Sequence, residues 1–118
     1  WENRPDRGPL LENWVLGELL KYVGPRTEVH YWRSKSGAEV DFVLVTGNSV
    51  TGIEVKATPL RTPRLPRSAR SFIDAYRPDQ FAVVNLGYEG EEEVAGRPVR
   101  WLRPHRLHSL VQAGGHMR

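Results

Sequence analysis

The sequence contains no cysteine, and only three of its 17 basic residues are lysine. Without cysteine, the chain cannot form disulfide bonds or zinc sites built from thiolates. It has no run of about 18 apolar residues and no secretory signal peptide, so a membrane-spanning helix is not expected. The G-x-x-x-x-G-K-[ST] nucleotide-binding pattern is also absent. We therefore expect a soluble, cytoplasmic domain without a membrane partner.

The length and charge of the chain indicate its broad class. Its 118 residues are enough for one domain. The net charge is +3, from 17 basic and 14 acidic residues, and this mild excess is compatible with a nucleic-acid partner. Because the sequence begins with Trp1, we expect it to be a piece of a longer protein. We predict a linker over residues 1–8, a single domain over 9–113 and a disordered tail over 114–118.

Hydrophobic periodicity and turn signals predict an α/β fold. Pro9 suits the first turn of a helix, and Gly24 with Pro25 stops that helix. The expected order is helix, three strands, helix, two strands, helix. The helices are predicted at 9–24, 67–77 and 104–113, and the strands at 28–33, 38–45, 49–57, 80–87 and 99–102. The acidic segment 88–98 is expected to be a loop.

Charged residues interrupt the second and third expected strands, SGAEVDFVLVTGNSVTGIEVKA at 36–57. A tight turn at Gly47 and Asn48 pairs residues whose numbers sum to 95. Asp41 then faces Glu54, and Glu39 faces Lys56. Period-two alternation places these four side chains on one face. The opposite face would carry the apolar residues Val40, Phe42, Leu44, Ile53, Val55 and Ala57.

Two carboxylates directly opposite each other repel, so the pattern calls for a compensating group. A metal ion, a shared proton or the cation of Lys56 could each supply it. Mg²⁺ (or Mn²⁺) suits these residue types, since it is bound through one or two carboxylates together with water and phosphate. The alternative is a solvated face whose charges form cross-strand ion pairs.

Glu12 adds a third carboxylate from the first expected helix. At 100° per residue it falls near the middle of an apolar arc formed by Leu11, Val15, Leu16, Leu19, Leu20, Tyr22 and Val23. A carboxylate on a buried face is rare unless it is paired or binds a metal. The alternative is that Glu12 reaches solvent or caps the first turn.

Taken together, these segments resemble a known superfamily. The stretch VDFVLVTGNSVTGIEVKA resembles the D-x(n)-E-x-K core of the PD-(D/E)XK nucleases, and GPLLENWVLGELLKYVG resembles their first helix. More closely, LLENWVLGELLKY, VHYWRSKSGAEVDFVL and GIEVKA resemble the domain of unknown function at the C-terminal end of bacterial and archaeal AAA+-type ATPases. The resemblance covers about residues 8–87; the strict Pro-Asp dipeptide is absent, because Val40 precedes Asp41.

The resemblance implies a restriction-endonuclease-like core, with a mixed β-sheet flanked by helices, that acts on DNA with Mg²⁺. It implies that Glu12, Asp41 and Glu54 bind the metal and that Asp41, Glu54 and Lys56 form the catalytic group. It further implies an ATPase domain upstream in the same chain and allows a homodimer. The alternative is a nuclease-like fold that no longer cleaves and binds nucleic acid or the parent ATPase instead.

Basic residues near the E-x-K strand are candidates for DNA contacts. Arg61, Arg64 and Arg67 follow that strand at steps of three, and Lys35 lies in the expected turn between the first two strands. Because Pro63 and Pro66 prevent one continuous helix, the spacing does not define a single helical face. A solvated surface is the alternative for these arginines.

Overall fold

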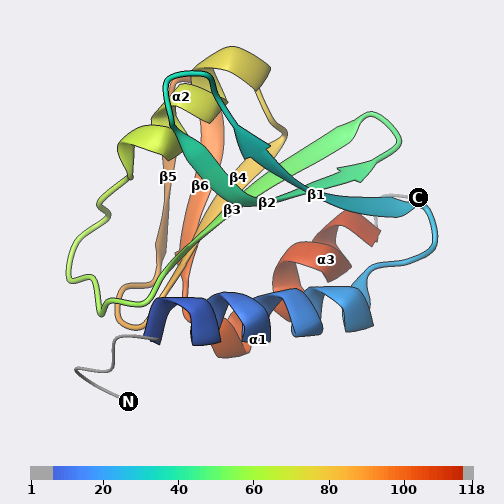
Figure 1. Cartoon of the computed structure of the whole chain (residues 1–118), viewed down its shortest axis with the longest axis horizontal. Coiled ribbons are helices and arrows are strands. Elements are labelled where there is room, and N and C mark those ends of the chain that lie inside the picture. The colour runs from blue at the N-terminus through green and yellow to red at the C-terminus, as the bar shows by residue number, and fades with distance from the viewer. Residues whose placement is uncertain (1–6, 116–118) are drawn as a thin grey trace.

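The computed structural model describes residues 7–115 and forms three layers. A six-stranded sheet lies between helices α1 and α3 on one face and helix α2 on the other (Figure 1). The elements in chain order are α1 (Arg7–Tyr22), β1 (Thr27–Arg33), β2 (Glu39–Thr46), β3 (Ser49–Lys56), α2 (Arg67–Tyr76), β4 (Gln80–Asn85), β5 (Gly90–Val94), β6 (Arg97–Leu102), the 3₁₀ helix η1 (Pro104–Arg106) and α3 (His108–Gly115). The predicted α/β class and the mixed sheet flanked by helices are confirmed.

The sheet has the strand order β1-β2-β3-β4-β6-β5 and is mixed. β1, β2 and β3 form an antiparallel meander, whereas β3, β4 and β6 run parallel to one another. A parallel pair needs a crossover connection, and α2 provides it between β3 and β4. β1 and β5 form the two edges of the sheet, and each is antiparallel to its neighbour.

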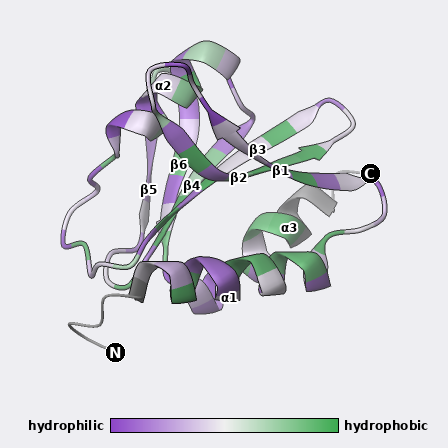
Figure 2. Cartoon of the chain, viewed as in Figure 1, coloured by the Kyte–Doolittle hydropathy of each residue, from purple (hydrophilic) through white to green (hydrophobic). Residues whose placement is uncertain are grey.

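Two clusters of buried side chains hold the layers together. The α1-side core consists of Leu11, Val15, Leu19, Leu44, Ile53, Val55, Ala82, Val84, Leu102, Leu107 and Leu110. The α2-side core consists of Val40, Val43, Ala69, Phe72, Ile73, Phe81, Val83, Val99 and Trp101. Figure 2 shows hydrophobic residues on both α1 and α3, which lie together beneath the sheet in this view. No helix among residues 7–115 is long and apolar enough to cross a bilayer.

The acidic segment predicted as a loop contains β5, so that prediction was wrong. Glu91, Glu92 and Glu93 pair with Arg100, Val99 and Pro98 of β6. Glutamate is disfavoured in strands, but the antiparallel ladder with β6 and the tight turn at Ala95 and Gly96 override that preference. The three glutamates are exposed, as expected.

The ends of the chain differ from prediction in three places. α1 begins at Arg7, inside the expected linker, and residues 1–6 lie outside the described residues. The last predicted helix is divided, because η1 occupies Pro104–Arg106 and α3 begins at His108. α3 includes Gly114 and Gly115 of the expected tail, whereas 116–118 lie outside the described residues.

The predicted apolar arc of α1 is narrower in the structure. Leu11, Val15 and Leu19, spaced by four residues, are buried. Leu20 and Tyr22 are exposed, because only one stripe of the helix reaches the sheet. Glu12 lies beside this stripe and is half-buried.

Candidate active site

The β2–β3 hairpin has the predicted register over most of its length. Paired residues run from Thr46 with Ser49 to Phe42 with Ile53, and each pair of numbers sums to 95. The ladder ends there, so the expected backbone pairs of Asp41 with Glu54 and of Glu39 with Lys56 do not form. The two strands therefore separate just where the charged residues begin.

A β-bulge in β2 accounts for this separation. Its partner strand β1 pairs His30 with Val43 and Trp32 with Val40, so two β1 steps correspond to three β2 steps. Asp41 and Phe42 therefore share the place opposite Tyr31. The extra residue reverses the alternation, and Val40 joins the α2-side core whereas Phe42 packs against the α1-side core. The prediction that Val40 and Phe42 share one face was wrong for this reason.

Asp41 uses its side chain to bridge the separated strands. Its Oδ2 atom accepts a hydrogen bond of 2.7 Å from the backbone N–H of Val55. The carboxylate thus replaces the backbone carbonyl that a regular ladder would have supplied from β2. This contact fixes the carboxylate between β2 and β3.

Glu54 is a buried carboxylate on the α2 side of the sheet, with 6% of its surface exposed. Ser68, in the first turn of α2, donates from Oγ to both carboxylate oxygens at 3.1 and 3.2 Å. The Nζ of Lys56 lies 3.6 Å from Oε2. Burial raises the pKa of Glu54, and the ammonium of Lys56 and the Ser68 hydroxyl oppose that rise.

Glu12 approaches these residues from α1. Burial, together with the charge and hydrogen bond of Asp41 and the charges of Glu39 and Glu54, raises the pKa of Glu12 to about 7. The pKa of Glu12 thus responds to Asp41 and Glu54, and we call these three carboxylates, from three elements, the carboxylate centre. That these three carboxylates bind a metal stays a prediction.

The donor set of the carboxylate centre suits a hard divalent cation, since it offers only carboxylate oxygens. A cation would also relieve the repulsion that raises the pKa of Glu12. However, among residues 7–115 no group of three or more His, Cys, Asp or Glu side chains is already arranged to hold a metal ion. Asp41 and Glu54 instead direct oxygens to Val55 and Ser68. The residue types fit Mg²⁺, and binding would require these side chains to adjust.

The residues predicted to contact DNA are all exposed and lie on two segments. Arg61 and Arg64 belong to the connection between β3 and α2, and Arg67 begins α2. The indole Nε1 of Trp101 donates to the backbone carbonyl of Arg64 at 3.0 Å and anchors that connection. Arg67 directly precedes Ser68, the residue that donates to Glu54. Lys35 lies apart, in the turn between β1 and β2.

Sequence reasoning missed two polar residues, one bonded to Glu54 and one paired in register with Lys56. Ser68 gives no sequence signal, because its contact with Glu54 depends on how α2 packs. Asn85, fully buried and paired with Lys56 across the parallel strands, accepts from the N–H groups of Gly87 and Tyr88 at 2.8 Å each. Its position before Leu86 and Gly87 is an Asx-turn signal that could have identified this role.

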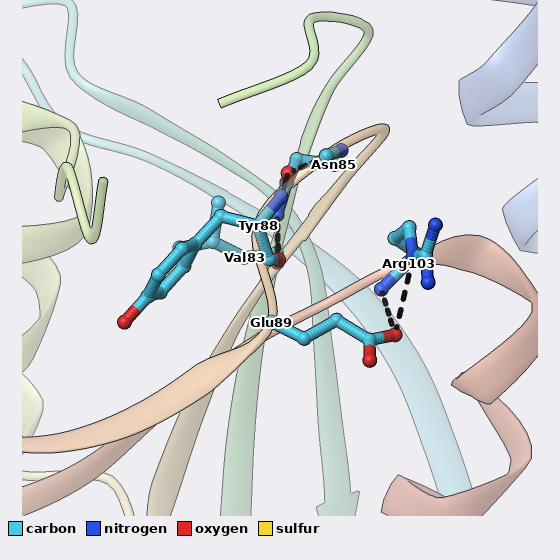
Figure 3. Close-up of polar contacts among 6 residues, drawn as sticks. Val83, Asn85, Tyr88, Glu89 and Arg103 are labelled. Atoms are coloured by element: carbon cyan, nitrogen blue, oxygen red, sulfur yellow. Dashed lines mark hydrogen bonds and ion pairs between the residues drawn. The ribbon is translucent and has the colours of Figure 1, made fainter. Parts of the chain in front are cut away.

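A second contact orders the same end of the sheet. Figure 3 shows Glu89 reaching Arg103, whose backbone N–H and Nε donate to Oε2 at 3.4 and 3.5 Å. Burial acts to raise the pKa of Glu89, but the hydrogen bonds and charge of Arg103 lower it below its ordinary value. Together with Asn85, this pair fixes the turn that follows β4.

Comparison with known proteins assigns a family to this arrangement. Residues 7–101 match the family model described as Domain of unknown function (DUF4143), from the start of α1 into β6. The chain belongs to this family. The DUF4143 match contains every residue of the carboxylate centre, together with Lys56 and Ser68.

Two mycobacterial proteins are similar to this DUF4143 domain. They are the uncharacterized protein Mb2031c of Mycobacterium bovis and the uncharacterized protein Rv2008c of Mycobacterium tuberculosis. Each is 32% identical over 90 residues, which is 76% of this chain. The chain spans about a fifth of the length of these relatives, since the match covers 19% of each.

Proposed function

We propose that this DUF4143 domain is a metal-dependent DNA endonuclease of the PD-(D/E)XK type with a restriction-endonuclease-like core. The observation that carries the proposal is the hydrogen bond by which Asp41 bridges β2 to β3 next to the buried Glu54, with the pKa of Glu12 of α1 responding to both charges. Crowded carboxylates repel one another, and a divalent cation is a common means of stabilising them. The mixed sheet flanked by helices supports the same proposal.

The chemistry follows from the residues of the centre. Glu12, Asp41 and Glu54 would hold Mg²⁺ or Mn²⁺, which when bound would polarise the phosphate and activate a water. Lys56, whose Nζ is 3.6 Å from Glu54 and half-exposed, would donate to that water or to the charge developing on the phosphate. Ser68 and the N–H of Val55 orient the two strand carboxylates. Arg61, Arg64, Arg67 and Lys35 would contact the DNA phosphates.

One observation favours a second candidate, a nuclease-like module that binds nucleic acid or protein without cleavage. The carboxylates of Asp41 and Glu54 are occupied by internal hydrogen bonds, and no ready-made metal cluster occurs within residues 7–115. Groups satisfied in this way can stabilise the fold without any metal.

Asp41→Asn tests the proposed site. The amide keeps the shape of the side chain and an oxygen for the Val55 N–H, but it removes the charge. We expect Mg²⁺-dependent nicking of branched or duplex DNA to fall by at least about 100-fold, equivalent to about 2.7 kcal/mol of transition-state stabilisation. Asp74→Asn, at an exposed carboxylate paired with Arg70, is the matched control and should keep full activity. Activity that persists in Asp41→Asn would contradict the site.

Calorimetric titration separates the two candidates. The endonuclease proposal requires Mg²⁺ or Mn²⁺ to bind the wild-type domain and to bind Asp41→Asn more weakly. Salt-sensitive DNA binding without any metal binding would support the non-cleaving nucleic-acid module. If neither metal nor DNA binds, a protein-interaction module remains.

For the full-length protein we propose an AAA+-type ATPase domain in the same chain. The two relatives have about four fifths of their length outside the match, which leaves room for such a domain. Purified full-length protein should therefore hydrolyse ATP, and the isolated domain described above should not. Absence of ATP hydrolysis by the full-length protein would contradict this part of the proposal alone.

A further inference from the structure

Tyr31 lies across from the β-bulge that carries Asp41. β1 pairs His30 with Val43 and Trp32 with Val40, so Tyr31 is opposite Asp41 and Phe42. Val29 packs against the α1-side core and Trp32 against the α2-side core, which sets the alternation along β1. Tyr31 therefore projects on the same side of the sheet as α1, the helix that carries Glu12.

The ring of Tyr31 is largely exposed to solvent. It is 72% exposed, the largest exposed fraction among the large hydrophobic side chains of the described residues. Tyr22, Tyr76 and Tyr88 each approach another aromatic ring. No ring-to-ring contact of Tyr31 occurs within residues 7–115. A rigid ring left in water beside the carboxylate centre is available to a ligand.

Cationic side chains continue from Tyr31 along the chain. Arg33 is two residues further on and shares its side of the sheet, and Lys35 lies in the following turn. Both are exposed, and Arg33 makes a surface contact with Glu39 at 3.3 Å. An aromatic platform flanked by cations is the usual composition of a surface that binds single-stranded nucleic acid.

We propose that Tyr31 stacks on an unpaired base of a DNA strand whose backbone passes over the carboxylate centre. The inference rests on the proposed function and extends it, because it assigns the substrate to DNA with unpaired nucleotides beside the target phosphate, such as a branch or a single-stranded end. A regular duplex keeps its bases stacked inside and offers Tyr31 no base to bind.

Fluorescence anisotropy with labelled DNA tests the proposal. The probes are an oligothymidylate and a duplex of equal length, with Ca²⁺ present to neutralise the carboxylates. Tyr31→Ala should weaken binding of the oligothymidylate by about 5- to 150-fold, since each stacked base contributes about 1–3 kcal/mol. Its affinity for duplex should change by less than about twofold. Tyr31→Phe should bind both probes as the wild type does, because the ring is retained.

Tyr22→Ala is the matched control, since Tyr22 is a 43% exposed tyrosine at the far end of α1 from Glu12. It should leave binding of the oligothymidylate unchanged. Equal binding by wild type and Tyr31→Ala would overturn the inference and leave the endonuclease proposal standing. Equal losses in Tyr31→Ala and Tyr31→Phe would also overturn it, because the hydroxyl rather than the ring would then matter. A wild-type domain that binds neither probe would overturn the DNA assignment as a whole.

Discussion

At the scale of single residues, Ser68 decides how Glu54 is presented. Its hydroxyl bridges both carboxylate oxygens and lowers the pKa that burial raises. Groups that orient metal-binding side chains commonly contribute 10- to 100-fold in metal affinity. Ser68 is therefore a positioning residue of the proposed metal site.

Ser68→Ala should weaken Mn²⁺ binding by about 10- to 100-fold because Glu54 loses its donor. Ser68→Thr should recover much of the affinity, since it restores a hydroxyl. Isothermal titration calorimetry gives the dissociation constants, and circular dichroism checks the fold. Ser71→Ala, at an exposed position of the same helix, should bind as the wild type does. A wild-type affinity in Ser68→Ala would remove Ser68 from the site.

The raised pKa of Glu12 should make the stability of the metal-free protein depend on pH. Its folded pKa of about 7 exceeds the ordinary value of 4.5, so the folded state holds the proton more tightly than the unfolded state. The resulting stabilisation is fully present below about pH 4.5 and is lost as the pH rises through 7. Asp41, Glu39 and Glu54 are the charged groups responsible, after burial itself.

Urea unfolding of wild type and Glu12→Gln in the presence of a chelator measures this effect. The free energy of unfolding of wild type should fall between pH 5 and pH 7.5 relative to the Gln variant, whose side chain stays neutral. Parallel curves for the two proteins would mean that Glu12 titrates normally and is not crowded by other carboxylates.

At the scale of elements, the turn between β5 and β6 contains local strain. Ala95 has a φ of 52° and Gly96 a φ of 80°, the conformation of a hairpin turn that favours Asn-Gly. A left-handed conformation costs an alanine about 1 kcal/mol. Ala95→Asn should therefore raise the free energy of unfolding by roughly 0.5–1 kcal/mol in urea denaturation. Gly96→Ala is the control and should destabilise the domain, because it places an alanine at a positive φ. A stabilised Gly96→Ala would show that the positive φ does not determine the stability of this turn.

Among the elements, those fixed by local signals could be predicted from the sequence. The register of the β2–β3 hairpin followed from the turn at Gly47 and from alternation, both of which are local. The bulge at Asp41 was not predictable, because it appears only when β2 pairs with β1. β5 was missed because its pairing with β6 overrides the low strand preference of three glutamates. The three acidic residues of the carboxylate centre were singled out from the sequence, and their role in metal binding stays a prediction. The contact of Ser68 with Glu54 depends on the packing of α2.

At the scale of the whole molecule, the net charge of +3 is distributed unevenly. The edge strand β5 presents three glutamates, whereas the connection from β3 to α2 and the first residue of α2 present Arg61, Arg64 and Arg67. Like charges along an edge strand discourage pairing with another chain. Under the proposed function, DNA approaches the arginine side.

Replacing Arg61, Arg64 and Arg67 together by Ala should weaken binding of all DNA sequences and make it less sensitive to salt. Each phosphate contact that is lost lowers the slope of log affinity against log salt by about 0.7 for single strands, so the slope should fall by roughly 2. Anisotropy titrations over a range of salt concentrations give the slope. Arg26→Ala, at an exposed arginine after α1, should leave it nearly unchanged. An unaltered slope in the triple variant would indicate a solvated surface.

The bulge in β2 also bears on how the family can change by insertion and deletion. One extra residue there shifts the phase of the strand, so that Val40 and Phe42 serve opposite cores. Removing one residue at this point would give a more regular sheet, but the residues before it would exchange faces. The gap between β2 and β3 would then close, and the Asp41 carboxylate would no longer bridge to the N–H of Val55. A length change that most strands tolerate at their ends would here remove the candidate site, so the spacing from Val40 to Val43 is as much a part of that site as Asp41 is.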